Sequence, residues 1–333
     1  DYNQGAAVVL VHDTLAFIGA MDSGVITLDI SYESQPVFVS HILPFVDFPE
    51  PPGLFSVPNA RGLDYRDHIL FVCYDAGGLR AIDMTDPYNP EEVGMYVNEG
   101  IESTAQSAYN NCKVLGDLCF VPVDYCGLDI VEVTDVENMT NYNWYNPWNC
   151  LPDNWDGRDG HSNQLVILPS QNLLFMSGAD SELLVYDISS PDEEHLVGQY
   201  VNLGDNIACW GVDVWNNAVV LSYVNNPLGI PYDSNVGGIQ ILEWSTEGQS
   251  VRETDPLSAM RVFPVPASHY VTIVVNDMLV GEFLTILDGS GREMGQIAVT
   301  GTTLRMDVSS LPTGTYDMVS SLGHHRRLVV RQP

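Results

Sequence analysis

The sequence predicts an all-β protein, a five-bladed β-propeller followed by a small Ig-like antiparallel β-sandwich. A motif of two apolar strands around an acidic residue occurs five times with a period of about fifty residues. The charge balance then changes. Residues 1–250 contain 36 Asp and Glu against five Lys and Arg, whereas residues 256–333 contain six of each sign. We therefore expect a propeller over residues 1–245, a polar linker over residues 246–258 and a second domain over residues 259–333.

The repeated unit is clearest in "GLRAIDMTDPYNPEEVG", which starts at Gly78. The acidic residue that closes the first strand of each copy is Asp29, Asp83, Glu132, Asp187 or Glu243. A tight turn with Asp or Asn and a further apolar strand precede every copy, as in "YRDHILFVC". Such residues tolerate left-handed backbone and favour tight hairpins. Each unit is thus expected to form four antiparallel strands.

The two ends of the repeat region predict how the ring closes. The fifth copy stops after "GIQILEWS" and lacks its outermost strand. The chain begins with "DYNQGAAVVLVHD", which is similar to "QYVNLGDNIACWGVDV" at the junction of the fourth and fifth copies. We expect residues 1–4 to complete the last blade.

The copies that start at Gly78 and Glu182 resemble LVIVD-type repeats, in which a Leu-Val-Ile-Val-Asp core precedes a Ser/Thr-Asp-Pro turn. The resemblance covers residues 7 to 245, although the third copy lacks the proline and the fifth contains an insertion. It implies a propeller in surface or secreted proteins. Because the family shares no catalytic residues, the resemblance transfers a fold and hardly any function.

Residues 259–333 contain short strands separated by a Gly-Ser-Gly turn and a Pro-Thr-Gly turn, which predicts an antiparallel sandwich. Four motifs follow in order: a Pro-x-Pro-Ala start, Asp-x-x-Gly-Arg, Leu-x-x-Gly-x-Tyr and a basic last strand. The residues are Pro264, Pro266, Ala267, Asp288, Gly291, Arg292, Leu311, Gly314, Tyr316, Arg326, Arg327 and Arg331. This order is similar to that of the C-terminal sorting domain of type IX secretion substrates in the Bacteroidetes.

The resemblance to sorting domains implies export through the periplasm and across the outer membrane to the cell surface or the medium. The type IX translocon and its sorting machinery would be the partners. An oxidising route favours disulfides among the six cysteines, with up to three bridges. Cys112 and Cys119 flank the Gly116-Asp117 turn, and we expect them to lie diagonally on one face of a hairpin.

Composition limits the classes of partner. The net charge of −32 repels phosphate backbones, which argues against nucleic acid as a ligand. No apolar run approaches the ~20 residues of a membrane span. The chain contains no G-x-S-x-G elbow, Walker loop, GxGxxG or HExxH.

Two loop segments carry candidate site residues. Asp153, Asp156 and Asp159 lie three apart in "DNWDGRDGHSNQ" and could supply oxygen ligands to calcium, or form a solvated acidic loop. His161 in the same stretch could pair with Asp159 as a general base. Tyr142, Trp144, Tyr145 and Trp148 either bind a glycan or protein partner or fill the contact between blades.

The sequence favours a non-enzymatic binding propeller, secreted or on the cell surface, with an unidentified protein or glycan ligand. One alternative is a secreted metal-assisted hydrolase or lyase that uses the propeller face. Another is a structural subunit of an extracellular assembly.

Overall fold

The computed structural model describes residues 5–332 apart from residues 33, 50–57, 102–107, 151–159, 181, 202–206, 227–233, 245–259, 264–266, 268, 276–278, 289–290 and 322–324. The predicted linker and residues 1–4 therefore lie outside the described residues. The chain divides into two compact units, residues 1–245 and 246–333. The fold is all-β, a five-bladed propeller followed by a sandwich, and each unit is considered by itself.

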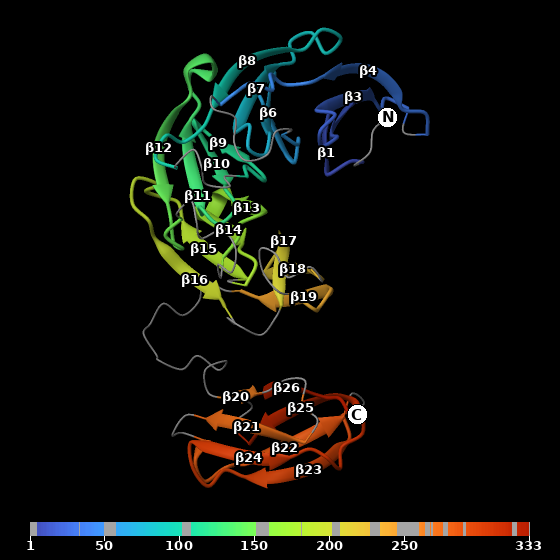
Figure 1. The fold of residues 1–333 in the computed structure, drawn as a ribbon, viewed down its shortest axis with the longest axis vertical. Coiled ribbons are helices and arrows are strands. Elements are labelled where there is room, and N and C mark those ends of the chain that lie inside the picture. The colour runs from blue at the N-terminus through green and yellow to red at the C-terminus, as the bar shows by residue number, and fades with distance from the viewer. Residues whose placement is uncertain are drawn as a thin grey trace. The chain divides into compact units, whose positions relative to one another are not determined.

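Five antiparallel sheets build the first unit (Figure 1). The first blade comprises β1 (Val8–His12), β2 (Leu15–Gly19), β3 (Val25–Asp29) and β4 (Val37–Ile42), and the second β5 (Gly62–Arg66), β6 (Ile69–Cys73), β7 (Leu79–Asp83) and β8 (Glu91–Tyr96). The third blade comprises β9 (Lys113–Leu115), β10 (Leu118–Pro122), β11 (Leu128–Glu132) and β12 (Thr140–Tyr145). The fourth comprises β13 (Leu165–Leu168), β14 (Leu173–Ser177), β15 (Leu183–Asp187) and β16 (Leu196–Tyr200). The fifth blade has β17 (Ala208–Trp215), β18 (Ala218–Val224) and β19 (Gly238–Glu243). Within each blade, strands adjacent in sequence pair antiparallel.

Local turn chemistry explains why the four-stranded unit recurs. The turn between the first two strands of each blade has a left-handed residue, and these are Asp13, Asp67, Gly116, Asn172 and Asn216. At the end of the third strand, Asp29, Asp83 and Asp187 each accept a hydrogen bond from the backbone N–H two residues later. The repeated aspartate is therefore a turn residue.

Consecutive blades pack through their innermost strands, in the order β1, β5, β9, β13 and β17, and follow one another along an arc (Figure 1). Between the second and third blades, Gly62 permits the close approach. A Cβ at this position would lie 2.4 Å from the Cα of Asn111. The middle blades bury both sheet faces, and Phe71 and Val72, adjacent on β6, are fully buried.

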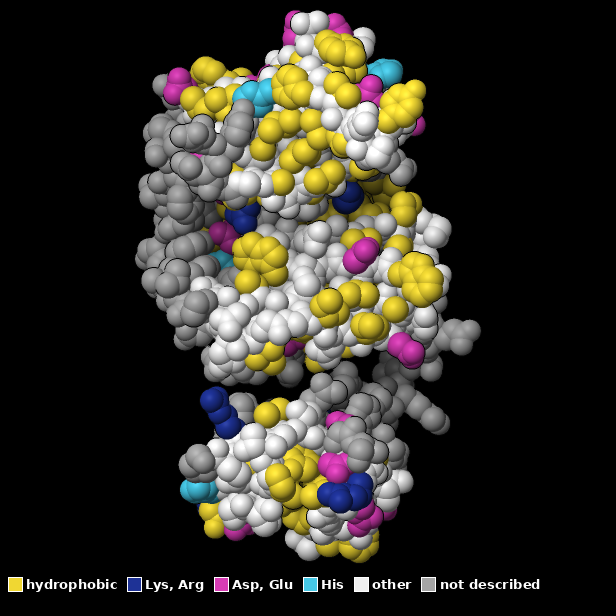
Figure 2. All heavy atoms as spheres, turned by 90° about the vertical axis from the view of Figure 1, so that its right-hand side faces the viewer, with side chains coloured by type: hydrophobic (Ala, Val, Ile, Leu, Met, Phe, Trp, Pro, Cys, Tyr) yellow, Lys and Arg dark blue, Asp and Glu magenta, His cyan; other side chains and the backbone are white. Residues whose placement is uncertain are grey.

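The first and last blades each expose one apolar face. On the first blade, Val9 and Phe38 are 57% and 62% exposed, and on the last blade Ile239 and Ile241 are 73% and 67% exposed. Figure 2 faces the side on which the two ends of the arc lie, and hydrophobic side chains are spread over it. A closed ring would bring these two faces together, and closure through residues 1–4 stays a prediction.

The second unit is a two-sheet sandwich. One sheet has the order β20-β21-β24 and the other β23-β22-β25-β26. The strands are β20 (Met260–Phe263), β21 (Tyr270–Val275), β22 (Phe283–Asp288), β23 (Glu293–Ala298), β24 (Thr303–Asp307), β25 (Gly314–Ser320) and β26 (His325–Val330). Alternating residues such as Val271, Ile273, Leu284 and Met318 point into the core, which gives the period of two expected for half-buried strands.

Candidate functional site

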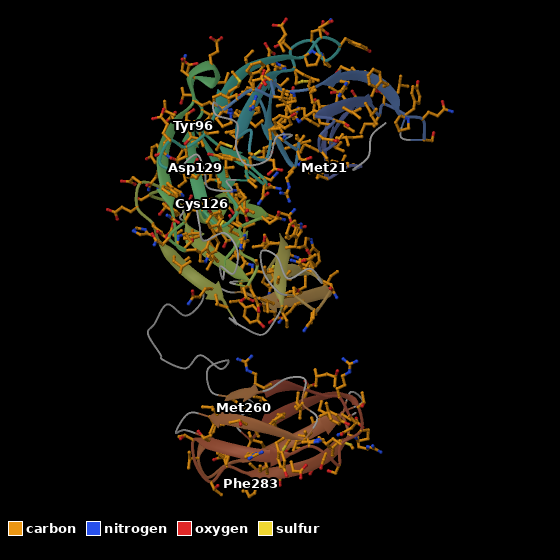
Figure 3. The ribbon with its side chains drawn as sticks, viewed as in Figure 1. Met21, Tyr96, Cys126, Asp129, Met260 and Phe283 are labelled. Carbon is orange, nitrogen blue, oxygen red and sulfur yellow. A yellow bond between two sulfur atoms is a disulfide. The ribbon has the colours of Figure 1, made fainter. Side chains whose placement is uncertain are left out.

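The turn between the second and third strands of a blade is joined to the start of the next blade. Isolated bridges connect Met21 with Ala60, Asp75 with Tyr109, Asp124 with Ser162 and Ala179 with Cys209. All four turn residues have positive φ, and Met21, labelled in Figure 3, is the first of them. One end of the propeller therefore has a repeated contact at which residues from different blades meet.

The positions around these bridges carry polar side chains in place of the apolar residues of the strands. Asp75 and Asp124 are themselves bridge residues at these turns. The other polar side chains belong to residues directly before or after the bridge residues Ala60, Tyr109, Ser162 and Cys209. We name the following residues the inter-blade cluster: Asn59, Arg61, Asp75, Asn110, Asp124, His161 and Trp210. They come from all blades except the first and from the segment that leads into the second.

Asp75 connects the part of the cluster that belongs to the second blade. Its Oδ2 accepts a hydrogen bond of 2.9 Å from Nδ2 of Asn59, and Nη1 of Arg61 lies 3.9 Å from its Oδ1. Burial raises the pKa of Asp75, and the nearby Asp124 carboxylate adds to this, while Arg61 and Asn59 act in the opposite direction. Asp75 and Asp124 are thus close enough to interact electrostatically across two blades.

Asp124 orients the imidazole of His161, which is 4% exposed. Their Oδ1 and Nδ1 atoms are 2.6 Å apart. The hydroxyl of the neighbouring Ser162 lies 2.7 Å from the carbonyl oxygen of Asp124 and 2.8 Å from that of Gly127. That hydroxyl therefore interacts with the backbone, and the contacts of Ser162 do not activate it as a nucleophile.

Three acceptor atoms of the cluster have no hydrogen-bond donor among the residues that the structure describes. They are Oδ1 of Asn59, Oδ1 of Asp75 and Oδ1 of Asn110, and all three are buried. The Trp210 side chain, from the last blade, is 40% exposed, and the guanidinium of Arg61 lies 5.8 Å from the centroid of its ring. The cluster thus combines unmet acceptors with a cation and an accessible aromatic ring. Figure 2 shows basic, acidic and histidine side chains beside a hollow between the first and last blades.

The aromatic residues singled out from the sequence have different environments. Tyr142 is 42% exposed, Trp144 and Trp148 are half-buried, and Tyr145 is 1% exposed. Nε1 of Trp144 donates to the carbonyl oxygen of Cys126, which forms a disulfide with Cys150 (Figure 3). The hydroxyl of Tyr145 contacts the carbonyl oxygens of Pro191 and Glu193 in the next blade. A partner-binding role for this set stays a prediction.

The predicted calcium ligands Asp153, Asp156 and Asp159 lie outside the described residues. Within the part of the chain that the structure describes, no group of three or more His, Cys, Asp and Glu side chains is arranged to hold a metal ion. His161 forms a hydrogen bond with Asp124. Its predicted partner Asp159 lies outside the described residues, so that pairing stays a prediction.

The tail residues are placed mainly at turns and at the sheet edge. Asp288 and Arg292 form an ion pair of 3.2 Å across the turn that contains Gly291, whose φ is +82°. The hydroxyl of Tyr316 donates to the carbonyl oxygen of Pro312. Ala267 forms a β-bridge with Val330, and Nε of Arg326 donates to the carbonyl oxygen of Met260. Leu311 packs against the core of the sandwich, and Gly314 begins β25. Arg331 is exposed, the side chain of Arg327 is not described, and Pro264 and Pro266 lie outside the described residues.

Sequence reasoning did not find the inter-blade cluster, with the exception of His161. A signal was present, because the segments "AMDSG", "YDAGG", "VDYCG" and "GADSE" occupy the same place in four copies. Their bridge residues are Met21, Asp75, Asp124 and Ala179, so this position varies chemically while its backbone conformation is constant. Such variation at a constant geometry indicates side chains that the fold does not require.

Residues 261–329 match the family described as "Secretion system C-terminal sorting domain". This match confirms the prediction of a type IX sorting domain at the C-terminal end. It indicates export by the type IX secretion system and a surface or secreted protein handled by that machinery. No curated protein is significantly similar to the chain. In the described residues, no helix has the length and apolar character needed to cross a bilayer.

Three solved structures illustrate what the chain is distantly similar to. The Cps50 (Swd1) β-propeller domain of Myceliophteria thermophila is 8% identical, with a TM-score of 0.47 over 98% of this chain and 96% of that one. PorZ, a surface component of the type IX secretion system of Porphyromonas gingivalis, is 11% identical, with a TM-score of 0.45 over 98% of this chain and 51% of that one. The designed protein Ika8 is 9% identical, with a TM-score of 0.46 over 97% of this chain and 83% of that one.

Proposed function

We propose that the chain is a type IX secretion cargo whose propeller is a non-enzymatic binding module, with the inter-blade cluster as its ligand site. The single observation that supports this proposal is the group of buried acceptors on Asn59, Asp75 and Asn110 that have no donor among the described residues. A buried acceptor without a donor costs about 1–3 kcal/mol, so a ligand that supplies donors gains that free energy on binding.

The chemistry of the cluster favours a sugar. Hydroxyl groups donate hydrogen bonds to the amide and carboxylate oxygens of Asn59, Asp75 and Asn110, and the apolar face of a sugar ring can stack on Trp210. The proposed ligand is therefore a terminal or branched sugar of a cell-surface glycan.

A hydrolase is the second candidate function, and the bond between Asp124 and His161 is the observation in its favour. A carboxylate that orients an imidazole is half of a general-base arrangement. The hydroxyl of Ser162, the residue after His161, is engaged with backbone carbonyl oxygens. The binding function is favoured because the described cluster offers acceptors for a ligand and no activated nucleophile.

Glycan binding is tested with the full-length protein on an array of neutral and acidic oligosaccharides. We expect binding to a subset of sugars, and we expect Asp75→Asn to weaken it about tenfold or more, because this change removes a charged acceptor. Tyr88→Ala is the control, since Tyr88 is 68% exposed in the turn between β7 and β8 and belongs to no part of the cluster. No binding to any sugar, or equal binding by wild type and Asp75→Asn, would contradict the proposal. Release of sugar products by wild type would support the hydrolase instead.

Export is tested in a producing cell. Removal of residues 261–329 is expected to leave the chain in the periplasm, because these residues form the sorting domain. The Asp75→Asn variant keeps that domain and should still reach the surface or the medium. Cell fractionation followed by intact-mass measurement shows where the truncated chain and the Asp75→Asn variant accumulate. Secretion of the truncated chain would refute the proposal that the protein is a type IX cargo.

A further inference from the structure

Three cysteines meet in the core between the second and third blades. Cys73 ends β6, Cys112 lies immediately before β9 and Cys119 lies on β10, and all three are fully buried. They belong to one hydrophobic cluster with Phe71, Leu79 and Tyr125. The binding function proposed above makes no use of them.

Backbone contacts place Cys73 and Cys112 against each other across the two blades. The Cys73 sulfur lies 2.8 Å from the carbonyl oxygen of Asn111, the residue before Cys112. The Cys112 sulfur lies 3.8 Å from the carbonyl oxygen of Phe71, two residues before Cys73. Each thiol therefore reaches the segment that carries the other, and Gly62 allows this approach because its place has no room for a side chain.

Cys119 approaches Cys112 within the third blade. Phe120 pairs with Lys113 and Cys119 with Val114, so Cys112 and Cys119 occupy diagonal positions of the β9–β10 hairpin, as the sequence predicted. The neighbouring thiols of Cys119 and Cys73 lower the pKa of Cys112. Burial raises the pKa of Cys73 and of Cys119 well above the ordinary value. Cys112 is thus the central member, in contact with both neighbours.

We propose that, in the exported protein, Cys112 forms a disulfide with one of its two neighbours, Cys73 or Cys119, while the third cysteine stays a thiol. The sorting domain directs the chain out of the reducing cytoplasm, and disulfides persist in such compartments. This bond would be additional to the one between Cys126 and Cys150. Because Cys112 lies next to the segment of Cys73 and diagonal to Cys119, we expect the disulfide of the trio to include it.

The oxidation is a thiol–disulfide exchange with a disulfide donor, either a disulfide oxidoreductase or a small-molecule disulfide. The Cys112 thiolate attacks one sulfur of the donor, forms a mixed disulfide and releases one donor thiolate. The neighbouring cysteine then loses its proton, attacks the Cys112 sulfur and releases the second donor thiolate. The donor disulfide is reduced to two thiols and the cysteine pair is oxidised. Since the trio is buried, the exchange must occur before the two blades close.

The two partners have different consequences for the fold. A bond from Cys112 to Cys119 stays within one hairpin, whereas a bond from Cys112 to Cys73 joins the second and third blades. The remaining thiol can attack the bond and exchange one form for the other without net oxidation. The trio therefore holds a single disulfide that can lie within a blade or between blades.

Tryptic mapping of the secreted full-length protein tests the assignment. The protein is denatured in acid, alkylated with N-ethylmaleimide and digested without reduction. Cleavage after Arg66, Arg80, Lys113 and Arg158 places Cys73 in residues 67–80, Cys112 in residues 81–113 and Cys119 in residues 114–158. We expect residues 81–113 joined to one of the other two peptides. Alkylated Cys112, or residues 67–80 joined to 114–158, would overturn the proposal.

Serine variants give an independent count of thiols in the denatured protein. The structure has four free cysteines besides Cys126 and Cys150. With the proposed bond, wild type has two reactive thiols, Cys112→Ser three, and Cys73→Ser and Cys119→Ser one each. Without it, wild type has four and each variant three. Refolding of the reduced proteins with oxidised glutathione should give the same thiol counts as those expected with the bond. Four thiols in wild type and three in each variant, in both the secreted and the refolded protein, would refute the assignment.

Discussion

Replacing Glu92 with alanine is expected to lower the free energy of unfolding by about 3–5 kcal/mol, because it leaves a buried guanidinium without its counter-charge. Arg80 is completely buried in the second blade, and its Nη1 lies 2.6 Å from Oε1 of Glu92. Urea denaturation of the two proteins at pH 7 measures the difference.

The surroundings of Arg80 explain why the loss is large. Its Nε donates to the carbonyl oxygen of Gly77, Nη1 to that of Phe45 and Nη2 to that of Phe48. The bonds to Phe45 and Phe48 join the second blade to the segment that follows β4. Glu92 adds a second link to the same segment, since its Oε2 accepts from the backbone N–H of Phe45.

Two further variants separate the charge from the packing. Glu92→Gln keeps an acceptor beside Arg80 and should cost less than the alanine change. The double change Arg80→Met with Glu92→Leu removes both charges and should recover part of the stability lost in Glu92→Ala, because buried ion pairs can be replaced by apolar side chains. A loss below about 1 kcal/mol in Glu92→Ala would show that water or rearrangement compensates the charge.

The contribution of Asp129 to the stability of the propeller is expected to fall by about 4 kcal/mol as the pH rises from 4 to 7, because Asp129 holds its proton in the folded state. Burial raises the pKa of Asp129 to about 7, against the opposing effect of four hydrogen bonds. In the unfolded chain the carboxyl ionises near pH 4. Between these values Asp129 binds its proton in the folded state and has lost it in the unfolded state, so its contribution to stability decreases with pH and changes little above pH 7.

The Asp129 network is complete and joins two blades. Oδ1 of Asp129 accepts from Nδ2 of Asn98 and Nδ2 of Asn141, and Oδ2 accepts from the hydroxyls of Tyr96 and Tyr109. Figure 3 shows Tyr96 and Asp129 close together, on β8 and β11. These four donors favour the ionised carboxylate, so burial alone is what raises the pKa of Asp129.

The matched control is the substitution Asp129→Asn, which removes the titrating proton and keeps the shape of the side chain. The new amide oxygen can still accept from Asn98 and Asn141, while the new amide nitrogen donates to the hydroxyl oxygens of Tyr96 and Tyr109. Thermal denaturation of both proteins from pH 4 to 8 gives two profiles, and their difference isolates Asp129 because all other carboxyls are common to both. Parallel profiles would contradict the raised pKa.

The repeat, the turns and the fold class could be predicted because their causes lie within a few residues. The left-handed residue at Asp13 or Asn172 and the aspartate that caps its own turn at Asp83 act on their immediate neighbours. Alternating burial along strands such as β21 also follows from local sequence. The order of motifs in the tail identified the sorting domain for the same reason.

Arg80 and Asp129 show where local patterns stop being informative. Both lie three residues before the acidic residue that closes the third strand of a blade, a position where the first and fourth copies have Ile26 and Leu184. The repeat therefore predicts a strand at this position and says nothing of a buried charge. The role of Arg80 became visible only from the carbonyl oxygens that surround it, and that of Asp129 from its four donors.

The sequence by itself determined the all-β class, the four-stranded unit and the sorting tail, since hydrophobic period and turn chemistry are local properties. Only the tertiary structure decided which residues meet between blades. His161 lies beside Asp124 and Cys73 beside the segment of Cys112 because consecutive blades pack against each other and bring together residues 37 and 38 positions apart in the chain. Contacts across a blade interface depend on packing geometry, which no local pattern encodes.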